Sequence, residues 1–481
     1  MAQTVHFRWQ PQRESSTPLY QQLITYCVTQ IRQGNWLVGQ QLPPQRELAR
    51  TYQVNRSTIH AAIAELQALG VVTTAHGRGT RVASNSWSTL LGATPDWQRW
   101  VHAGEFSANQ PTIQTINQRE FATPIRLSTG ELGPDLFPRQ AVQTAMHQAA
   151  DQLTTLNYLP ARGSLALREA LLRRLATWGV QTTPENILIT SGSLQALQLI
   201  TAALLEPGTT VYTAPASYLR SLRVLESVQA KWAPVPVDEQ GLAYWQIPVS
   251  SQPQLLYTVP TFDNPLGTVM SAQRRQDLLA FAQKYQLPII EDTAYQELWL
   301  DQRPPLPLKA HDTQGNVLYL GTVSKDLAPG LRVGWLVGPQ AVVARLADVK
   351  MQMDYGASTL SQQTLVNLLT APDYPQTLQR LRDQLRARRE AALASLAATL
   401  GDLATWQRPA GGFYLWVQLP AKVDLPRLFQ AALAQGVLAN PGTVYGARTN
   451  AVRLSYAYAT PAEFRQGVTV LATLIRDQLS R

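Results

Sequence analysis

The sequence predicts an α/β protein in which a mostly parallel sheet is followed by a small α+β part and preceded by a compact helical segment. From about residue 126, β-rich runs alternate with stretches of helical periodicity, a pattern typical of a mostly parallel sheet covered by helices. Residues 17–83 show a different order: three helical stretches and then two short β-rich runs. Hydrophobic cores rarely grow beyond about 250–300 residues, so a chain of 481 residues should form more than one domain.

Composition argues against several classes of protein. The apolar content of 45% is ordinary for a globular protein, and no apolar run is long enough to predict a membrane span. The N-terminal stretch lacks the apolar core of a secretory signal. The single cysteine, Cys27, lies in a helical apolar pattern and is interpreted as a small core residue rather than a redox site. These features favour a cytoplasmic protein, and we expect no metal site.

Positive charge is concentrated near the N-terminus. The chain carries a net charge of +9, and residues 1–83 hold eight arginines, no lysine and three acidic residues. A basic segment joined to a nearly neutral remainder suggests a polyanionic partner for the basic segment. The alternative is a basic surface that serves solubility only.

The N-terminal segment predicts a winged helix-turn-helix. Apolar periodicity indicates helices over 18–34, 44–52 and 55–70. The β-rich runs at 71–74 and 80–82 flank a short glycine-containing turn and predict a hairpin. In such a unit the third helix enters the major groove of DNA by its first turn.

The polar residues of this segment are candidate DNA contacts. Arg56 could reach a guanine edge or a phosphate, and Arg46 lies where a helix N-terminus also attracts anions. The alternative is a three-helix adaptor whose arginines face water, and Glu47 is interpreted as a structural helix residue. The candidate DNA-binding residues are Arg46, Arg56, Ser57, Thr58, His60, Gly77, Arg78 and Gly79.

Three ordered motifs in this segment match a known type of DNA-binding domain. They read LPPQRELA at 42–49, VNRSTI at 54–59 and GRGT at 77–80. Together they resemble the GntR-type winged-helix domain over about residues 17–83. His60 stands where many members carry an arginine, which affects one phosphate contact. The resemblance implies binding to a double-stranded DNA operator.

Residues 84–125 are rich in Ser, Thr, Asn, Gln and Trp and show weak periodicity, so we expect a linker with some local structure. The remaining chain, 126–481, divides into a large part of about 126–360 and a small part of about 361–481. A long helix is expected at 376–400. Strands are expected at 187–190, 210–212, 255–258, 288–291, 317–319, 334–337, 412–418 and 451–455.

One lysine after a predicted strand is a candidate for covalent chemistry. Lys325 lies among small residues in GTVSKDLAPGLRVGW, the segment 321–335. A Schiff-base lysine needs a lowered pKa, commonly from desolvation or a nearby cation. Arg332, seven residues later, offers a forked cation suited to a phosphate. A lone lysine of this kind is more often a surface residue, so the interpretation depends on the neighbouring motifs.

Those motifs follow other predicted strands. The loop 191–195 opens a helix and could cradle a phosphate, although such loops also serve as plain turns. Tyr218 could stack on a flat ring or belong to the core. Asn264 offers a side-chain amide. Asp292 could pair with a protonated pyridine nitrogen or cap the next segment. Ligands of open α/β sheets bind beyond the carboxyl ends of the strands, where all these groups are expected.

Together these motifs resemble fold-type I, aminotransferase-like proteins over about residues 126–478. The resemblance implies pyridoxal 5'-phosphate as cofactor and Lys325 as its aldimine lysine. It implies Asp292 at the ring nitrogen and Asn264 with Tyr295 at the ring hydroxyl. It implies a stacking role for Tyr218. The residues that it implies around the phosphate are Gly192, Ser193, Leu194, Thr322 and Arg332.

Two further residues are assigned by this resemblance. Arg453, in the run VRLS, matches the arginine that binds a substrate carboxylate, with an ordinary strand-edge arginine as the alternative. Tyr158 resembles the tyrosine that reaches the phosphate of the neighbouring subunit. The sequence YLPARG at 158–163 departs from the usual YGDPxG, and Leu194 replaces a commoner Gln. The departure at 158–163 bears on the contact between subunits.

The joined halves resemble the MocR subfamily of GntR-type transcription regulators. The resemblance implies a head-to-tail homodimer and a small amino-compound effector that displaces Lys325 from the cofactor. The cofactor itself could instead be the signal. The competing hypotheses are a genuine aminotransferase with a DNA-binding segment, and an inert dimerisation module descended from an enzyme.

Overall fold

The computed structural model describes residues 4–5, 7–33, 35–75, 79–83 and 109–480. The chain divides into two compact units, Met1–Thr123 (unit 1) and Pro124–Arg481 (unit 2), each described by itself. Of the expected linker, residues 84–108 lie outside the described residues, and 109–123 fall in unit 1.

Unit 1 contains the predicted three helices and hairpin. The strands β1 and β2 pair antiparallel, with Val72 opposite Val82. Their order along the chain is that of a winged helix-turn-helix. The elements are α1 (Leu19–Arg32), α2 (Gln45–Thr51), α3 (Arg56–Ala68), β1 (Val72–Ala75) and β2 (Gly79–Val82), followed by α5 (Pro111–Arg119).

The core of unit 1 extends beyond the predicted 17–83. Ile59 and Leu66 of α3 are fully buried, as the apolar periodicity predicts. Val5 and Trp9 are buried in the same core, and the backbone N–H of Val5 donates to the carbonyl of Gln41 at 2.9 Å. Val5 and Trp9 therefore belong to this folded unit.

A seven-stranded sheet forms the centre of unit 2. Its strand order is β4-β12-β11-β10-β9-β5-β6, and every neighbouring pair is parallel except the two that involve β12. The prediction of a mostly parallel sheet is confirmed. The strands are β4 (Ile187–Thr190), β5 (Thr210–Thr213), β6 (Lys231–Pro234), β9 (Gln254–Thr258), β10 (Ile289–Asp292), β11 (Val317–Thr322) and β12 (Gly334–Val337).

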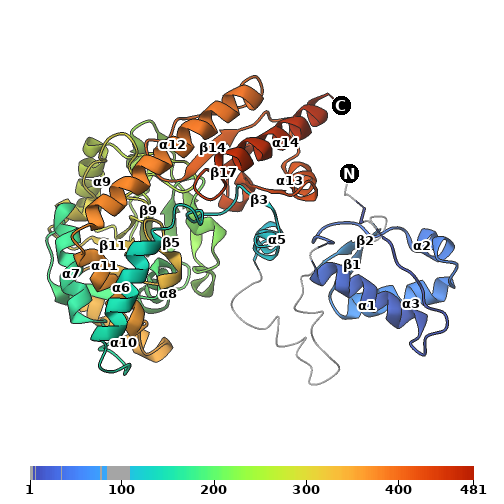
Figure 1. The fold of residues 1–481 in the computed structure, drawn as a ribbon, viewed down its shortest axis with the longest axis horizontal. Helices are drawn as coiled ribbons and strands as arrows, with labels where there is room; N and C mark the ends of the chain where they lie inside the picture. The colour runs from blue at the N-terminus through green and yellow to red at the C-terminus, as the bar shows by residue number, and fades with distance from the viewer. Residues whose placement is uncertain (1–3, 6, 34, 76–78, 84–108, 481) are drawn as a thin grey trace. The chain divides into compact units, whose positions relative to one another are not determined.

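Helices cover both faces of this sheet (Figure 1). Successive residues of a strand point to opposite faces. Leu188 of β4 accordingly packs in the core with α8 and α10, whereas Ile187 and Ile189 pack in the core with α6, α7 and α11. The helices are α6 (Arg139–Gln152), α7 (Leu165–Thr177), α8 (Ser193–Leu204), α9 (Ala272–Tyr285), α10 (Gln340–Met353) and α11 (Thr359–Thr370).

A small antiparallel sheet and three helices complete unit 2. The sheet has the order β13-β14-β17-β16, and α12 confirms the predicted long helix. Figure 1 shows α12 beside α14. No helix in the described part of the chain is long and apolar enough to cross a membrane. The elements are α12 (Tyr374–Leu400), β13 (Thr405–Trp406), β14 (Tyr414–Gln418), α13 (Leu425–Ala434), β16 (Asn440–Pro441), β17 (Ala451–Ser455) and α14 (Pro461–Leu479).

Candidate nucleic-acid interface and cofactor site

The first turn of α3 separates polar from apolar residues. Arg56, Ser57 and His60 are exposed and Thr58 is half-buried, while Ile59 faces the core. This is the amphipathic arrangement expected of a helix that packs by one face and leaves the other available to a partner. The four polar residues predicted on α3 are therefore accessible together.

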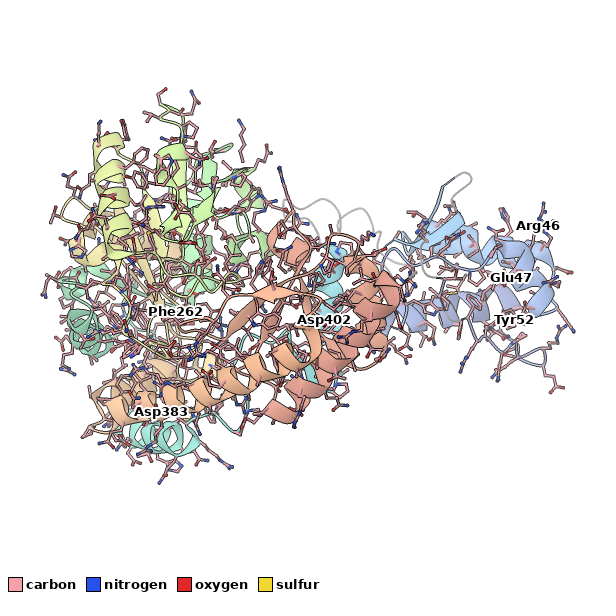
Figure 2. All side chains as sticks on the ribbon, turned by 90° about the horizontal axis from the view of Figure 1, so that it is seen from above. Arg46, Glu47, Tyr52, Phe262, Asp383 and Asp402 are labelled. Carbon is pink, nitrogen blue, oxygen red and sulfur yellow. The ribbon has the colours of Figure 1, made fainter. Side chains whose placement is uncertain are left out.

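The N-terminus of α3 is open to an anion. Asn55 precedes the helix, and its side chain makes no capping hydrogen bond to the first turn. Helix N-termini carry a partial positive charge and unpaired N–H groups, which suit a phosphate. Arg46, exposed in the first turn of α2, lies at the edge of unit 1 in Figure 2. Of the predicted wing, Gly79 begins β2, whereas Gly77 and Arg78 lie outside the described residues.

Lys325 lies in the turn that follows β11, half-buried in unit 2. Its Nζ donates a hydrogen bond to the carbonyl of Gly130 at 2.7 Å. The hydroxyl of Thr322 accepts from the N–H of Ser324 at 3.1 Å and so shapes the turn. A lysine fixed in this way beyond the carboxyl end of a strand is placed as the sequence predicted.

A buried ion pair between Arg174 and Asp326 holds this turn in place. Asp326 accepts from Nη2 of Arg174 at 2.6 Å, and Nε of Arg174 lies 3.5 Å from Glu297. Both acidic side chains are almost inaccessible to solvent, so loss of either partner would leave a buried charge. The backbone on both sides of Lys325 is therefore held in place.

Asp292 ends β10, the strand next to β11. One carboxylate oxygen accepts from the Tyr257 hydroxyl at 2.7 Å and the other from the N–H of Ala294 at 3.0 Å. Burial raises the pKa of Asp292, and the bond from Tyr257, the bond from Ala294 and the charge of Lys325 act against that rise. A cation beside this carboxylate would favour its ionised form.

Asn264 connects the candidate ring contacts with Arg453. Its Nδ2 donates to the Tyr295 hydroxyl at 3.3 Å, and its Oδ1 accepts from Nη1 of Arg453 at 2.9 Å. The Tyr295 hydroxyl also lies 3.0 Å from the hydroxyl of Tyr414. Burial, followed by the neighbouring Tyr414, raises the pKa of Tyr295 well above its ordinary value, so its phenol keeps its proton.

Arg453 is a buried cation, 4% exposed, in the middle of β17. Its Nη2 donates to the carbonyl of Ser128 at 2.5 Å, and its guanidinium lies 4.0 Å from the ring centroid of Tyr414. Its Nε is buried without a hydrogen-bond partner in the described structure. A buried donor without a partner costs stability, so an unused donor here favours a ligand with acceptor oxygens.

Gly192 and Arg332 form an anion cradle at the start of α8. Gly192 has a φ of 90°, and a methyl group placed on it would lie 2.7 Å from Nη2 of Arg332. A methyl group on Gly334 would lie 2.8 Å from the N–H nitrogen of Ser193. No side chain in the described chain caps α8, and Nη2 of the exposed Arg332 donates to the carbonyl of Ser191, just before the helix, at 3.1 Å. Open amides beside a guanidinium match a phosphate.

The two remaining predicted residues differ in their surroundings. Tyr218 donates its N–H to the carbonyl of Asn264 at 2.9 Å, and burial raises the pKa of its phenol to about 12. Tyr158 is 80% exposed, with its ring 5.4 Å from that of Tyr355. Tyr218 thus belongs to the connected site, whereas no described contact joins Tyr158 to Lys325.

Three residues of the site were missed by the sequence analysis. Tyr257 lies within β9 and Tyr414 begins β14, so both have the pattern of core strand residues. Gly130 precedes the first strand predicted in unit 2 and belongs to no motif. Only the position of Tyr414, at the start of a strand and shortly after two glycines, could have indicated a site residue.

These residues fit pyridoxal phosphate. The cradle of Gly192 and Arg332 suits the phosphate, Asp292 a protonated ring nitrogen, and Lys325 an aldehyde. The fold and the site together define an aminotransferase-like body of fold-type I, carried by unit 2, in a chain that begins with a winged helix-turn-helix.

The comparisons with known proteins place the chain in a family. Residues 122–471 match the family described as aminotransferase class I and II, which is pyridoxal-phosphate-dependent, and residues 19–82 match the bacterial regulatory proteins of the gntR family. The chain therefore belongs to the GntR-type regulators with an aminotransferase class I and II body, the MocR-type architecture.

Relatives share both halves. The uncharacterized HTH-type transcriptional regulator YisV of Bacillus subtilis (strain 168) is 44% identical, with 98% of each chain covered. The HTH-type transcriptional regulator NorG of Staphylococcus aureus (strain N315) is 31% identical, over 90% of this chain and 99% of that protein. These are regulators by name, and the family is one of transcription regulators.

Solved aminotransferases resemble unit 2. The multiple substrate aminotransferase of Thermococcus profundus has a TM-score of 0.74 and 26% identity, over 80% of this chain and 100% of that one. LysN, an α-aminoadipate aminotransferase of Thermus thermophilus complexed with N-(5'-phosphopyridoxyl)-L-leucine, has a TM-score of 0.72 and 28% identity, over 82% of this chain and 99% of that one.

Proposed function

We propose that this regulator binds pyridoxal phosphate on Lys325 and senses an amino compound, or the cofactor itself, through that lysine. The observation that carries the proposal is that Lys325, Asp292, Gly192 and Arg332 lie at one edge of one sheet, where β4, β10 and β11 end and the antiparallel β12 begins. The related LysN structure contains N-(5'-phosphopyridoxyl)-L-leucine, a cofactor–amino acid adduct, which supports binding of both groups by this fold.

Each residue of the site has a physical role in this proposal. When bound, the cofactor supplies an aldehyde that condenses with primary amines and a ring that withdraws electrons. Asp292 keeps a proton on the ring nitrogen, while Asn264 and Tyr295 hold the ring hydroxyl. Arg332 holds the phosphate, together with the amides at the start of α8 and the hydroxyl of Thr322. Tyr218 supports the ring face.

In this proposal Arg453 selects an amino compound that carries a carboxylate. Its guanidinium is buried, and its Nε has no partner in the described structure, so a carboxylate would complete its hydrogen bonds. An effector amine would compete with Lys325 for one position. Regulation requires that the liganded and free forms bind DNA differently, and a tenfold difference needs about 1.4 kcal/mol of coupling.

We further propose a head-to-tail homodimer. The exposed rings of Tyr158 and Tyr355 form an aromatic pair that a second subunit would cover, bringing Tyr158 to the cofactor phosphate of that subunit. Two-fold symmetry would offer two copies of unit 1 to two operator half-sites. Binding of an operator by Arg46, Arg56 and the wing implies a cytoplasmic location.

The second candidate function is that of a genuine aminotransferase with a DNA-binding segment. Lys325, Asp292 and Arg453 are all present and each is hydrogen-bonded within unit 2, and a solved aminotransferase covers 80% of the chain. Repeated rapid turnover with an amino acid and a keto acid would favour this candidate. Amine exchange without turnover would favour the regulator.

The test is covalent trapping on the full-length protein. After reconstitution with pyridoxal phosphate and borohydride reduction, peptide mapping should find one adduct, on Lys325. Lys325→Ala should abolish it, whereas the exposed Lys422→Ala should leave it unchanged. An unloaded protein, or an adduct spread over surface lysines, contradicts the proposal. A regulator further predicts that the effector changes operator affinity of the native protein and not of Lys325→Ala.

A further inference from the structure

Tyr414 occupies a place in the site that no motif assigned. It begins β14, is 3% exposed and pairs with Ser455 of β17. The preceding glycines allow this placement, because a methyl group on Gly411 would lie 2.4 Å from the ring of Phe262. Figure 2 shows Phe262 in the interior of unit 2. The small sheet can therefore approach the loop that carries Asn264 closely enough for Tyr414 to enter the site.

The Tyr414 hydroxyl and the amine of Lys325 both lie close to Gly130. A methyl group placed on Gly130 would lie 2.5 Å from the Tyr414 hydroxyl oxygen and 3.8 Å from Nζ of Lys325. Both polar atoms thus border one point, beside the carbonyl that already accepts from Nζ. A primary amine in this position carries more N–H hydrogens than the single bond to the Gly130 carbonyl uses, so a second acceptor on this side could bind it.

Either phenol could donate in the contact between Tyr295 and Tyr414, and a bound cofactor would select the direction. Their oxygens lie 3.0 Å apart, and each phenol carries one hydrogen. The oxygen of Tyr295 already accepts from Nδ2 of Asn264 at 3.3 Å. If Tyr295 gives its hydrogen to the ring hydroxyl of the cofactor, the hydrogen of Tyr414 must fill the bond between them. The oxygen of Tyr414 then keeps a free lone pair.

Arg453 packs against the side chain of Tyr414. Its guanidinium is 4.0 Å from the ring centroid of Tyr414, so the ring supports the candidate carboxylate contact while the hydroxyl borders the candidate amine position. One residue is thus placed against both ends of a small amino acid. Removing only the hydroxyl of Tyr414 should therefore affect binding of the amine but not of the carboxylate.

We infer that the Tyr414 hydroxyl accepts a hydrogen bond from the amine that takes the place of Lys325, which makes Tyr414 a specificity-determining residue for primary amines. The inference rests on the proposed function and deepens it. It assigns recognition of the effector amine to Tyr414 and recognition of the carboxylate to Arg453. Effectors must then keep an N–H donor on the nitrogen that replaces Lys325.

The experiment uses the full-length protein loaded with pyridoxal phosphate and three probes: methylamine, glycine and maleate. Cofactor absorbance reports the binding of the two amines, and competition with glycine reports the binding of maleate. Tyr414→Phe should raise the dissociation constants of methylamine and glycine about tenfold, or about 1.4 kcal/mol, the loss expected for one hydrogen bond. The dissociation constant of maleate should not change.

Tyr456→Phe is the matched control. It removes another buried phenol hydroxyl near the small sheet, one that donates to the carbonyl of Gly412 at 2.7 Å. Its amine affinities should match those of the native protein. Should Tyr414→Phe fold poorly in thermal unfolding, 3-fluorotyrosine at position 414 keeps the ring and hydroxyl but weakens the oxygen as an acceptor. This variant should raise the dissociation constants of methylamine and glycine by less than Tyr414→Phe does and leave that of maleate unchanged.

The outcomes separate the two proposals. If the native protein and Tyr414→Phe bind methylamine with equal dissociation constants, the assignment of Tyr414 is wrong. The cofactor proposal is then unaffected. Equal losses for methylamine, glycine and maleate overturn the assignment of Tyr414 as well, since they would indicate general damage to the site. A native protein whose absorbance never responds to an amine overturns both.

Discussion

The two units place their candidate binding groups in opposite surroundings. Arg46 and Arg56 of unit 1 are exposed, and no side chain in the described part of that unit pairs with either. Asp292, Asn264 and Arg453 of unit 2 are buried and hydrogen-bonded to one another or to their neighbours. A polyanion attracts solvated cations over a distance, whereas a small ligand needs groups oriented in advance. Unit 1 therefore depends on charge, and unit 2 on geometry.

The largest effect is expected from Asp292→Ala in unit 2. The variant leaves the hydroxyl of Tyr257 without its acceptor and removes the partner of the cofactor ring nitrogen. Loss of one member of a buried charged pair costs about 4 kcal/mol, so affinity for pyridoxal phosphate should fall about 1000-fold in an equilibrium titration. Asp301→Ala, which breaks the ion pair with Arg389 elsewhere in unit 2, should bind normally. A loss below tenfold for Asp292→Ala would refute its role.

The separate cores can be tested by one substitution in each. Ile59 in unit 1 and Ile189 in unit 2 are both fully buried. Ile→Ala at such positions costs about 3 kcal/mol. In calorimetry of the full chain, Ile59→Ala should lower only the transition of unit 1 and Ile189→Ala only that of unit 2. If either variant shifts both transitions equally, the units do not unfold independently.

A pH dependence is expected from Asp263, which lies beside Asn264 in unit 2. Burial, reinforced by the charge of Asp292, raises the pKa of Asp263 to about 7. Its protonated form thus stabilises the fold fully below the ordinary carboxyl pKa of about 4, and this contribution is lost as the pH rises through about 7. Asp263→Asn should reduce the fall in unfolding free energy between pH 5 and 8 by roughly 2 kcal/mol.

Denaturant unfolding of the cofactor-free protein measures this effect. The control is Asp301→Asn, because Arg389 lowers the pKa of Asp301. Its stabilising contribution is present above the ordinary carboxyl pKa and is lost only as the pH falls below it. That variant should therefore match the native protein between pH 5 and 8. An unchanged slope for Asp263→Asn would show that its carboxyl is ionised throughout.

The smallest effect is expected for Arg56→Ala in unit 1. Operator affinity should fall about tenfold and the salt dependence should weaken by about one ion, as for one lost phosphate or base contact. Stability should hardly change, because the side chain is exposed. Arg427→Ala, an exposed arginine of unit 2, serves as the control in a binding titration at several salt concentrations. Equal losses for the two variants would point to net charge alone.

The sequence predicts best where one residue and its neighbours carry the signal. The strands ending at Thr190 and Val337 were predicted with the bounds that the structure has, because strand periodicity is a local property. Lys325 was selected by its motif, and its role remains a prediction. The edge strand β6 was not predicted. Its buried and exposed residues do not alternate, so its pattern resembles a loop.

The missed site residues show the limit of local patterns. Tyr257 has the neighbours of any buried strand residue, and its bond to Asp292 joins positions 35 residues apart. Tyr414 lies 119 residues from Tyr295, in the small sheet. Such contacts depend on the relative placement of sheet and loops, which no window of sequence contains. The predicted Tyr158 and the wing residues remain predictions.

The burial of Val5 and Trp9 bears on how parts of such regulators can be exchanged. A chimaera that takes over only residues 19–82, the stretch matched by the family, would leave a hydrophobic pocket in unit 1 where these two side chains belong. An exchange of DNA specificity between relatives therefore has to include Val5 and Trp9 together with the helices. Without them, the recognition helix of the chimaera would pack on a destabilised core.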